Sequence, residues 1–164
     1  MVSPGERAAE EWNITMTLDL APGATVTIDG QKFTVEESSS FHEVDFRLDI
    51  VRLVGSTAAH ERWLLAVQSE PHLMLVQRLE QDWLTPLSSG FVHEGELFQP
   101  VVRGSAHRVR RVRGGGRAKG RLDYALFRSN SGRVVLTIGQ NEEVEAWIGR
   151  TVPPGAVELP GRAA

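Results

Sequence analysis

The stretch that decides the fold class reads Asp29-Gly30-Gln31-Lys32-Phe33-Thr34-Val35. A second stretch with the same Gly-x-x-Phe spacing reads Glu94-Gly95-Glu96-Leu97-Phe98-Gln99-Pro100-Val101. An Asp-Gly pair favours a tight β-hairpin because glycine adopts positive φ without steric cost. We expect Asp29 and Glu94 to be turn formers, with a ligand role as the alternative. The chain therefore contains two similar hairpin starts.

The segments that follow the two hairpin starts are also alike. Each start precedes a β-rich aromatic segment (46–53 and 122–128) and then an apolar run (63–67 and 134–138). Polar and apolar side chains alternate between residues 17 and 29, which is typical of half-buried strands. Clusters of Gly, Pro, Asn and Ser recur at strand-like intervals. We predict an all-β protein of two related β lobes from an internal duplication, barrel-like or sandwich-like, with at most short helices.

The predicted organisation has four parts, namely a flexible leader (1–14), a first β repeat (15–86), a second β repeat (87–160) and a tail (161–164). The boundary between the repeats follows the Pro, Ser and Gly residues of segment 85–90. The strongest competing helix signal lies in residues 74–83, where Leu75, Leu79 and Trp83 have four-residue spacing.

The composition indicates a protein that is not exported. The chain has 164 residues, enough for a core of its own. It has no cysteine, which excludes disulfides, thiolate metal ligands and cysteine nucleophiles. Residues 1–12 lack the apolar centre of a signal peptide, and no later stretch is apolar enough for a membrane helix. We expect a cytoplasmic location.

The net charge of −3 hides an uneven distribution of charge along the chain. Segment 103–121 contains eight basic residues and no acid, whereas the rest of the chain contains ten basic and 21 acidic residues. The sequence therefore predicts a basic hairpin on an acidic body.

Four arginines form the centre of this basic segment: Arg108, Arg110, Arg111 and Arg113. Guanidinium groups suit bidentate contact with carboxylates or phosphates. We predict that these arginines bind an acidic protein or a membrane-associated partner, and the alternative is that they pair with acids of the same chain. Nucleic acid is disfavoured as a partner because no aromatic residue is interleaved with the arginines and the sequence pI is near 6.0. The oligomeric state is left open.

No motif in the sequence predicts catalysis. Adjacent His-Glu pairs occur at 42–43, 60–61 and 93–94. Neighbours in a strand point to opposite faces, so such a pair does not readily give two ligands to one metal. No serine lies in a Gly-x-Ser-x-Gly turn, and the glycine-rich segment 114–120 lacks the spacing of a P-loop. We expect a protein that is not an enzyme, with no catalytic residue, metal site or cofactor.

Four tryptophans lie at positions 12, 63, 83 and 147. Trp63 and Trp147 fall inside apolar runs, which indicates packing in the core. An aromatic cage for a ligand would require two or three of them to converge on one cleft.

Several short motifs, in this order, resemble a bacterial family, the domain of unknown function family 4178. They are Gly30-x-x-Phe33-x-Val35, Arg62-Trp63-Leu64-Leu65-Ala66-Val67, His72-Leu73-Met74-Leu75-Val76, Gly95-x-x-Phe98, Arg103-Gly104-Ser105-Ala106, Leu122-Asp123-Tyr124 and Trp147-Ile148-Gly149. The resemblance covers roughly residues 18–159 and implies a β-rich, non-enzymatic protein. Relatives tend to be encoded beside polyamine-synthesis-like and small membrane proteins, and no functional residue of the family can be carried over.

Two functions follow as expectations. The first is an accessory role in a polyamine-linked or envelope-stress system, with the basic hairpin as the contact. The alternative is the binding of a small cation such as a polyamine in an acidic, aromatic cleft between the lobes.

Overall fold

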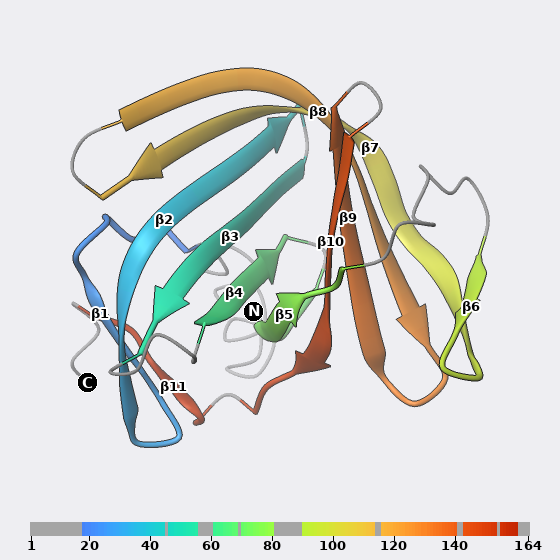
Figure 1. Ribbon diagram of the computed structural model, residues 1–164, viewed down its shortest axis with the longest axis horizontal. Coiled ribbons are helices and arrows are strands. Elements are labelled where there is room, and N and C mark those ends of the chain that lie inside the picture. Colours follow the sequence, from blue (N-terminus) through green and yellow to red (C-terminus); the bar gives the residue numbers. More distant parts are fainter. Residues whose placement is uncertain are drawn as a thin grey trace, which may run out of the picture.

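The computed structural model describes residues 18–44, 46–55, 61–68, 70–80, 90–113, 116–140, 143–153 and 155–160. Within these residues the chain forms one antiparallel sheet of eleven strands and no helix (Figure 1). No helix in this part of the chain is therefore long and apolar enough to cross a membrane. The predicted leader and tail, and the boundary at 85–90 except Gly90, lie outside the described residues.

The strands are β1 (Thr25–Ile28), β2 (Gln31–Glu43), β3 (Phe46–Val54), β4 (Glu61–Val67), β5 (Met74–Arg78), β6 (Phe91–His93), β7 (Glu96–Val112), β8 (Gly116–Ser129), β9 (Arg133–Gln140), β10 (Glu143–Thr151) and β11 (Val157–Glu158). The competing helix signal at 74–83 was misleading, because residues 74–78 form β5 and residues 81–83 are not described.

Both predicted hairpin starts form two-residue turns. Asp29 and Gly30 have φ angles of +49° and +81°, and Glu94 and Gly95 have φ angles of +51° and +78°. Positive φ at both central residues is the geometry that matches the twist of a two-residue β-hairpin. Asp29 and Glu94 are therefore turn formers, as expected.

The two halves of the chain share further features at equivalent positions. The register of the sheet shifts between Val35 and Glu37 in β2, and again between Pro100 and Val102 in β7. A bulge tolerates proline because the ladder is locally interrupted there. The turn, the following phenylalanine and the bulge recur in the same order and at the same spacing in both halves.

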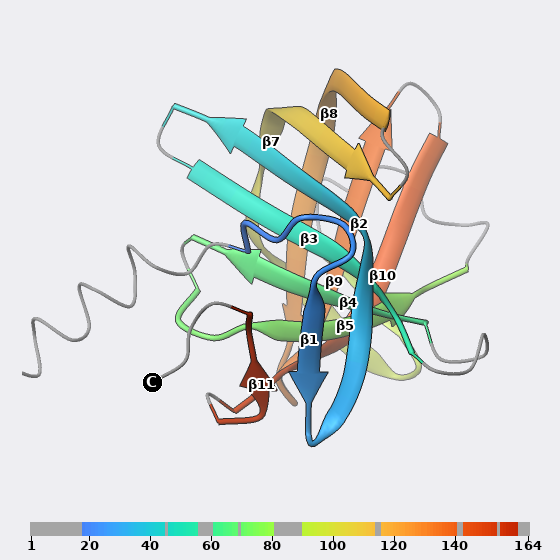
Figure 2. The same cartoon turned by 90° about the vertical axis from the view of Figure 1, so that its left-hand side faces the viewer.

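Eight of the described strands close into a barrel. Their order is β2-β3-β4-β5-β10-β9-β8-β7, and β7 then pairs with β2. Two antiparallel seams therefore join the halves, β2 with β7 and β5 with β10. The prediction of an all-β, barrel-like fold is confirmed, and strands from both halves share one wall. β11 lies at the end of the second half in sequence yet pairs with β1 at the edge of the first (Figure 2).

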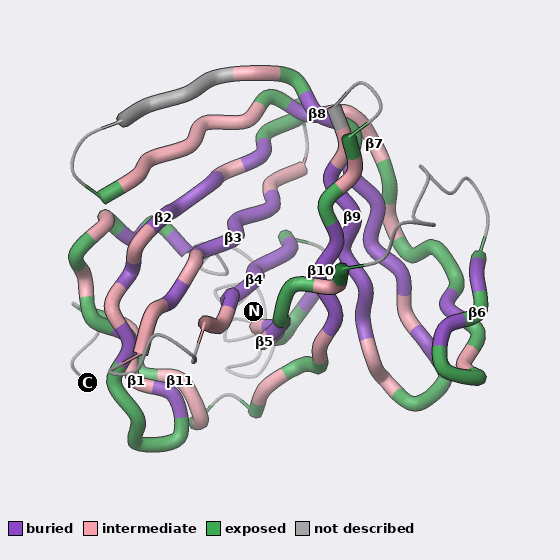
Figure 3. Tube along the Cα trace, in the orientation of Figure 1, coloured by how far each residue is buried: buried purple, intermediate pink, exposed green. Residues whose placement is uncertain are grey.

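Apolar side chains fill the inside of the barrel and cover parts of its outside. Figure 3 shows where the buried residues lie along the strands. The inner cluster takes residues from all eight barrel strands, among them Phe41, Leu65 and Leu136. One outer cluster, including Leu18 and Phe33, lies on the first half. A second, including Phe98, lies on the second half. Successive side chains of a strand point to opposite faces of the sheet, so one set packs inside the barrel and the other packs in an outer cluster.

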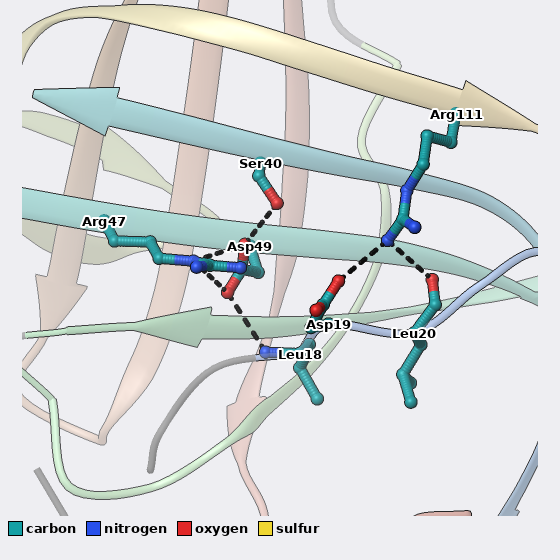
Figure 4. Close-up of polar contacts among 7 residues, drawn as sticks. All are labelled: Leu18, Asp19, Leu20, Ser40, Arg47, Asp49 and Arg111. Atoms are coloured by element: carbon teal, nitrogen blue, oxygen red, sulfur yellow. Dashed lines mark hydrogen bonds and ion pairs between the residues drawn. The ribbon is translucent and has the colours of Figure 1, made fainter. Parts of the chain in front are cut away.

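Asp49 in β3 anchors the first described residues to the barrel (Figure 4). Its carboxylate is 1% exposed and accepts hydrogen bonds from Leu18 N at 3.0 Å, Ser40 Oγ at 2.6 Å and Arg47 Nε at 3.0 Å. A buried carboxylate requires partners of this kind to offset its lost hydration. The contacts hold segment 18–20 across the outside of the sheet.

We expect Asp49→Asn to lower the free energy of unfolding by about 2–4 kcal/mol, because it removes the charge from a buried hydrogen-bonded pair. Chemical denaturation measures this loss. Asp19→Asn is the matched control. Asp19 is 75% exposed in its pair with Arg111, so this variant should lower the free energy of unfolding by less than about 1 kcal/mol. Equal losses in the two variants would contradict the anchoring role.

The β5–β10 seam requires a glycine at position 149. A Cβ added to Gly149 would lie 1.9 Å from the carbonyl oxygen of Leu75 in the neighbouring strand. Backbone atoms cannot yield as a flexible side chain does, so the strands would have to move apart.

Gly149→Ala should therefore lower the free energy of unfolding by about 2 kcal/mol or more. Gly139→Ala in β9 is the control, since its nearest contact would be a side-chain carbon of Val144 at 3.4 Å. Thermal melting of both variants checks the difference, and similar melting temperatures would refute this account of the seam.

Candidate functional site

A cavity of about 350 Å³ lies at one end of the barrel interior. Its lining comes from both halves of the chain and includes the aromatic residues Phe41, Trp63 and Trp147. Toward the other end the interior is filled by apolar side chains such as Leu65 and Met74. The interior of the barrel is thus packed with side chains at one end and contains the cavity at the other.

Two tryptophans converge on the cavity. The rings of Trp63 and Trp147 meet edge to face, with centroids 5.3 Å apart. Trp63 Nε1 donates to Glu61 Oε1 at 3.1 Å. Trp147 is 2% exposed, and its Nε1 has no hydrogen-bond partner within the described residues. The two indoles pack in the core, as the sequence indicates, and also line the cavity.

A buried carboxylate shared by two guanidinium groups lies on the β2–β7 seam. Glu37, 8% exposed at its side chain, forms ion pairs with Arg110 Nε and with Arg108 Nη2, the latter at 3.5 Å. Arg108 also lies over the ring of Phe41, 5.8 Å from its centroid. Burial lowers the pKa of Arg108, and the neighbouring charge of Arg110 lowers it further, against the opposing effect of Glu37.

Two further ion pairs belong to the lining of the cavity. Arg52 Nε lies 2.9 Å from Glu61 Oε1, and Arg78 Nη2 lies 2.7 Å from Glu145 Oε1. The side chains of these pairs are between 38% and 48% exposed. The deep part of the cavity is therefore aromatic, and its more exposed part carries paired charges.

Three of the four arginines predicted to bind a partner lie in β7 and divide between its two faces. Arg108 and Arg110 line the cavity. On the opposite face, Arg111 contacts Asp19 Oδ1 at 2.9 Å and the Leu20 carbonyl at 3.3 Å (Figure 4). Each of the four has an acidic partner in this chain, which matches the intramolecular alternative.

Arg113 belongs with neither group. Its side chain is 57% exposed and lies 3.4 Å from Glu36 Oε2. None of these contacts tests the binding of a second protein or a membrane, and that function stays a prediction.

Sequence reasoning missed most of the residues that line the cavity. Glu37, Ser39 and Phe41 alternate along the inner face of β2, and Arg108 and Arg110 do so along β7. Polar residues at inward positions of a strand are a readable signal of a hollow interior. This signal could not be used at the sequence level, because the sequence does not show which face of each strand points into the barrel.

The His-Glu pairs at 42–43 and 93–94 lie on different elements, β2 and the β6–β7 hairpin. His42 is exposed in β2, and His60 lies outside the described residues. His93 Nε2 lies 3.3 Å from Glu94 Oε1 on the β6–β7 hairpin. The described part of the chain contains no group of three or more His, Asp or Glu side chains arranged to hold a metal ion.

At the end of the barrel away from the cavity, Tyr124 contacts Glu43. Tyr124 is 3% exposed, its hydroxyl donates to Glu43 Oε2 at 3.3 Å, and its ring stacks on Phe46 with centroids 5.0 Å apart. Burial, and then the negative charge of Glu43, raise the pKa of Tyr124 to about 12.

Since the chain has a single tyrosine, its ionisation can be followed by tyrosinate absorbance. We expect a pKa near 12 in the folded protein and near its ordinary value of about 10 in denaturant. Folding then favours the neutral phenol, so this contribution to stability is complete below about pH 10 and is lost as the pH rises toward 12. Glu43→Gln should move the folded pKa down, and an unchanged titration would refute the role of that carboxylate.

Comparison with known proteins places the barrel in a family. The family model described as Domain of unknown function (DUF4178) matches residues 21–154. Neither the curated proteins nor the solved structures include a match. The matched range contains β1 to β10, hence the complete barrel wall and every described residue that lines the cavity. With this match over most of its length, the chain belongs to the family Domain of unknown function (DUF4178).

Proposed function

We propose that this protein binds a small molecule inside the barrel. The observation that carries the proposal is the cavity of about 350 Å³ between the two halves, with aromatic walls at depth and paired charges toward its exposed part. Ligand sites are typically concave, several hundred Å³ in volume, mostly apolar, and equipped with a few fixed polar groups. The cavity has the concave form, the volume and the fixed polar groups of such a site, although most of its lining residues are polar or charged rather than apolar.

The packing of the barrel limits where such a ligand lies. Leu48, Leu65 and Met74 are fully buried within the inner cluster and leave the hollow to the end lined by Glu37 and Trp147. A rigid, well-packed floor keeps the side chains above it in fixed positions, which lowers the entropy lost on binding. The fold therefore favours a compact ligand over an extended one.

The functions expected from the sequence remain proposals beside this one. A cleft between the halves that binds a polyamine would coincide with the cavity, where Glu61 and Glu145 already face arginines. Contact of the basic hairpin with an acidic protein or membrane now depends mainly on Arg111 and Arg113, which lie outside the cavity lining. The polyamine-linked or envelope-stress role rests on the family resemblance alone.

The uncharged fluorescent probe N-phenyl-1-naphthylamine tests the cavity directly. We expect it to bind one site, to brighten, and to quench tryptophan emission, since Trp63 and Trp147 line that site. Ser39→Phe places a large side chain in the cavity and should weaken binding at least about tenfold.

His42→Phe is the matched control, because it adds the same side chain to an exposed position of the same strand and should leave the affinity unchanged. Circular dichroism verifies that both variants fold. Absence of probe binding to the parent protein, or equal binding by a folded Ser39→Phe variant, would reject the proposal.

A further inference from the structure

We infer that the ligand of the barrel is a small organic anion, an apolar or aromatic body that carries a carboxylate, sulfonate or phosphate group. The inference rests on the proposed function and adds the charge of the ligand and the residues that recognise it. Arg108, Arg110 and Trp147 are the recognition residues.

The first observation is a local excess of positive charge on the seam. Glu37 is one carboxylate between two guanidinium groups, those of Arg108 and Arg110. Arginine stays protonated in proteins, so the excess cannot be removed by loss of a proton. An anion bound beside Arg108 would relieve both causes that lower its pKa, the lost hydration and the nearby Arg110 charge.

The second observation is independent of charge and concerns unused hydrogen-bond donors. Arg108 Nε and Trp147 Nε1 are buried and have no hydrogen-bond partner within the described residues. Arg110 Nε contacts Glu37 as an ion pair without hydrogen-bond geometry. Buried polar groups in folded proteins are nearly always hydrogen-bonded. The unused atoms of Arg108 and Trp147 are N–H donors on residues that line the cavity, so the missing partner is an acceptor.

A cation would suit the cavity less well than an anion, because carboxylates that line it already accept hydrogen bonds. Glu61 accepts from both Arg52 and Trp63, and Glu145 accepts from Arg78. A cationic ligand would have to compete with these arginines for Glu61 and Glu145, and the further lining carboxylate, Glu80, is exposed to solvent. An anion needs no such exchange, because the unused donors are already present.

The body of the ligand follows from the walls. Phe41, Trp63 and Trp147 give aromatic surface to the cavity that the donors line, and Ile50 and Ile138 add aliphatic surface. A bare inorganic anion would leave this surface without contact. The site therefore suits an amphipathic molecule with its charged group toward Arg108 and its apolar part among the rings.

A matched pair of probes tests the inference: 8-anilinonaphthalene-1-sulfonate is N-phenyl-1-naphthylamine with an added sulfonate. We expect the sulfonate to bind the parent protein at least about tenfold more tightly than the neutral probe. Arg108→Met should abolish this preference while the neutral probe still binds, and Trp147→Phe should reduce it. Arg111→Gln in the same strand, outside the cavity lining, is the control and should retain it.

The outcomes separate the two proposals. Binding of the neutral probe without a preference for the sulfonate would overturn the inference and leave the binding function in place. Failure of both probes would overturn both. A sulfonate signal that persists in Ser39→Phe would place that probe on the surface and overturn the inference. Displacement of the neutral probe by spermidine, together with a higher melting temperature of the parent protein, would indicate that the ligand is a cation and would overturn the inference.

Discussion

The antiparallel pairing of β2 with β7 is the constraint on which the rest of the structure depends. Residues 37–42 of β2 pair with residues 107–112 of β7, and within the described residues this seam and the β5–β10 seam join the two halves into the barrel wall. Without the β2–β7 seam the sheet would have two long open edges, which are prone to pair with other chains. A slip of one residue would also turn Glu37 away from Arg108 and Arg110. The ion pairs of the buried Glu37 therefore favour one register of closure, at the cost of partly removing these charges from water.

The seam that closes the barrel also keeps it hollow. Inward positions of β2 and β7 near the cavity hold Glu37, Ser39, Arg108 and Arg110, whereas inward positions elsewhere hold residues such as Leu65 and Leu136. Charged groups resist complete desolvation, so they cannot fill an interior as leucine does. A cavity is consequently expected at the end of the barrel where the closing residues are charged. Closure of the barrel and the lining of the cavity depend on the same side chains.

Much of the fold was predictable because its signals are local, whereas the site depends on contacts between distant segments. The turns at Asp29 and Glu94 and the period-two alternation identify an all-β chain from a few neighbouring residues. The choice of a single barrel depends on β2 pairing with β7, which the sequence pattern of either strand does not specify. The convergence of Trp63 and Trp147 was hidden for the same reason, since β4 and β10 are far apart in sequence.

Charge counted along the sequence and charge placed in space lead to different expectations. Segment 103–121 carries eight basic residues and no acid, which in an extended hairpin would form a basic surface. In the barrel its central arginines lie beside Asp19, Glu36 and Glu37, all from the first half of the chain. Antiparallel closure pairs a basic strand with an acidic one, and much of the segmental charge is compensated where the halves meet. On the β2–β7 seam, two guanidinium groups face one carboxylate inside the cavity, so part of the positive charge of the segment lies in the interior of the barrel.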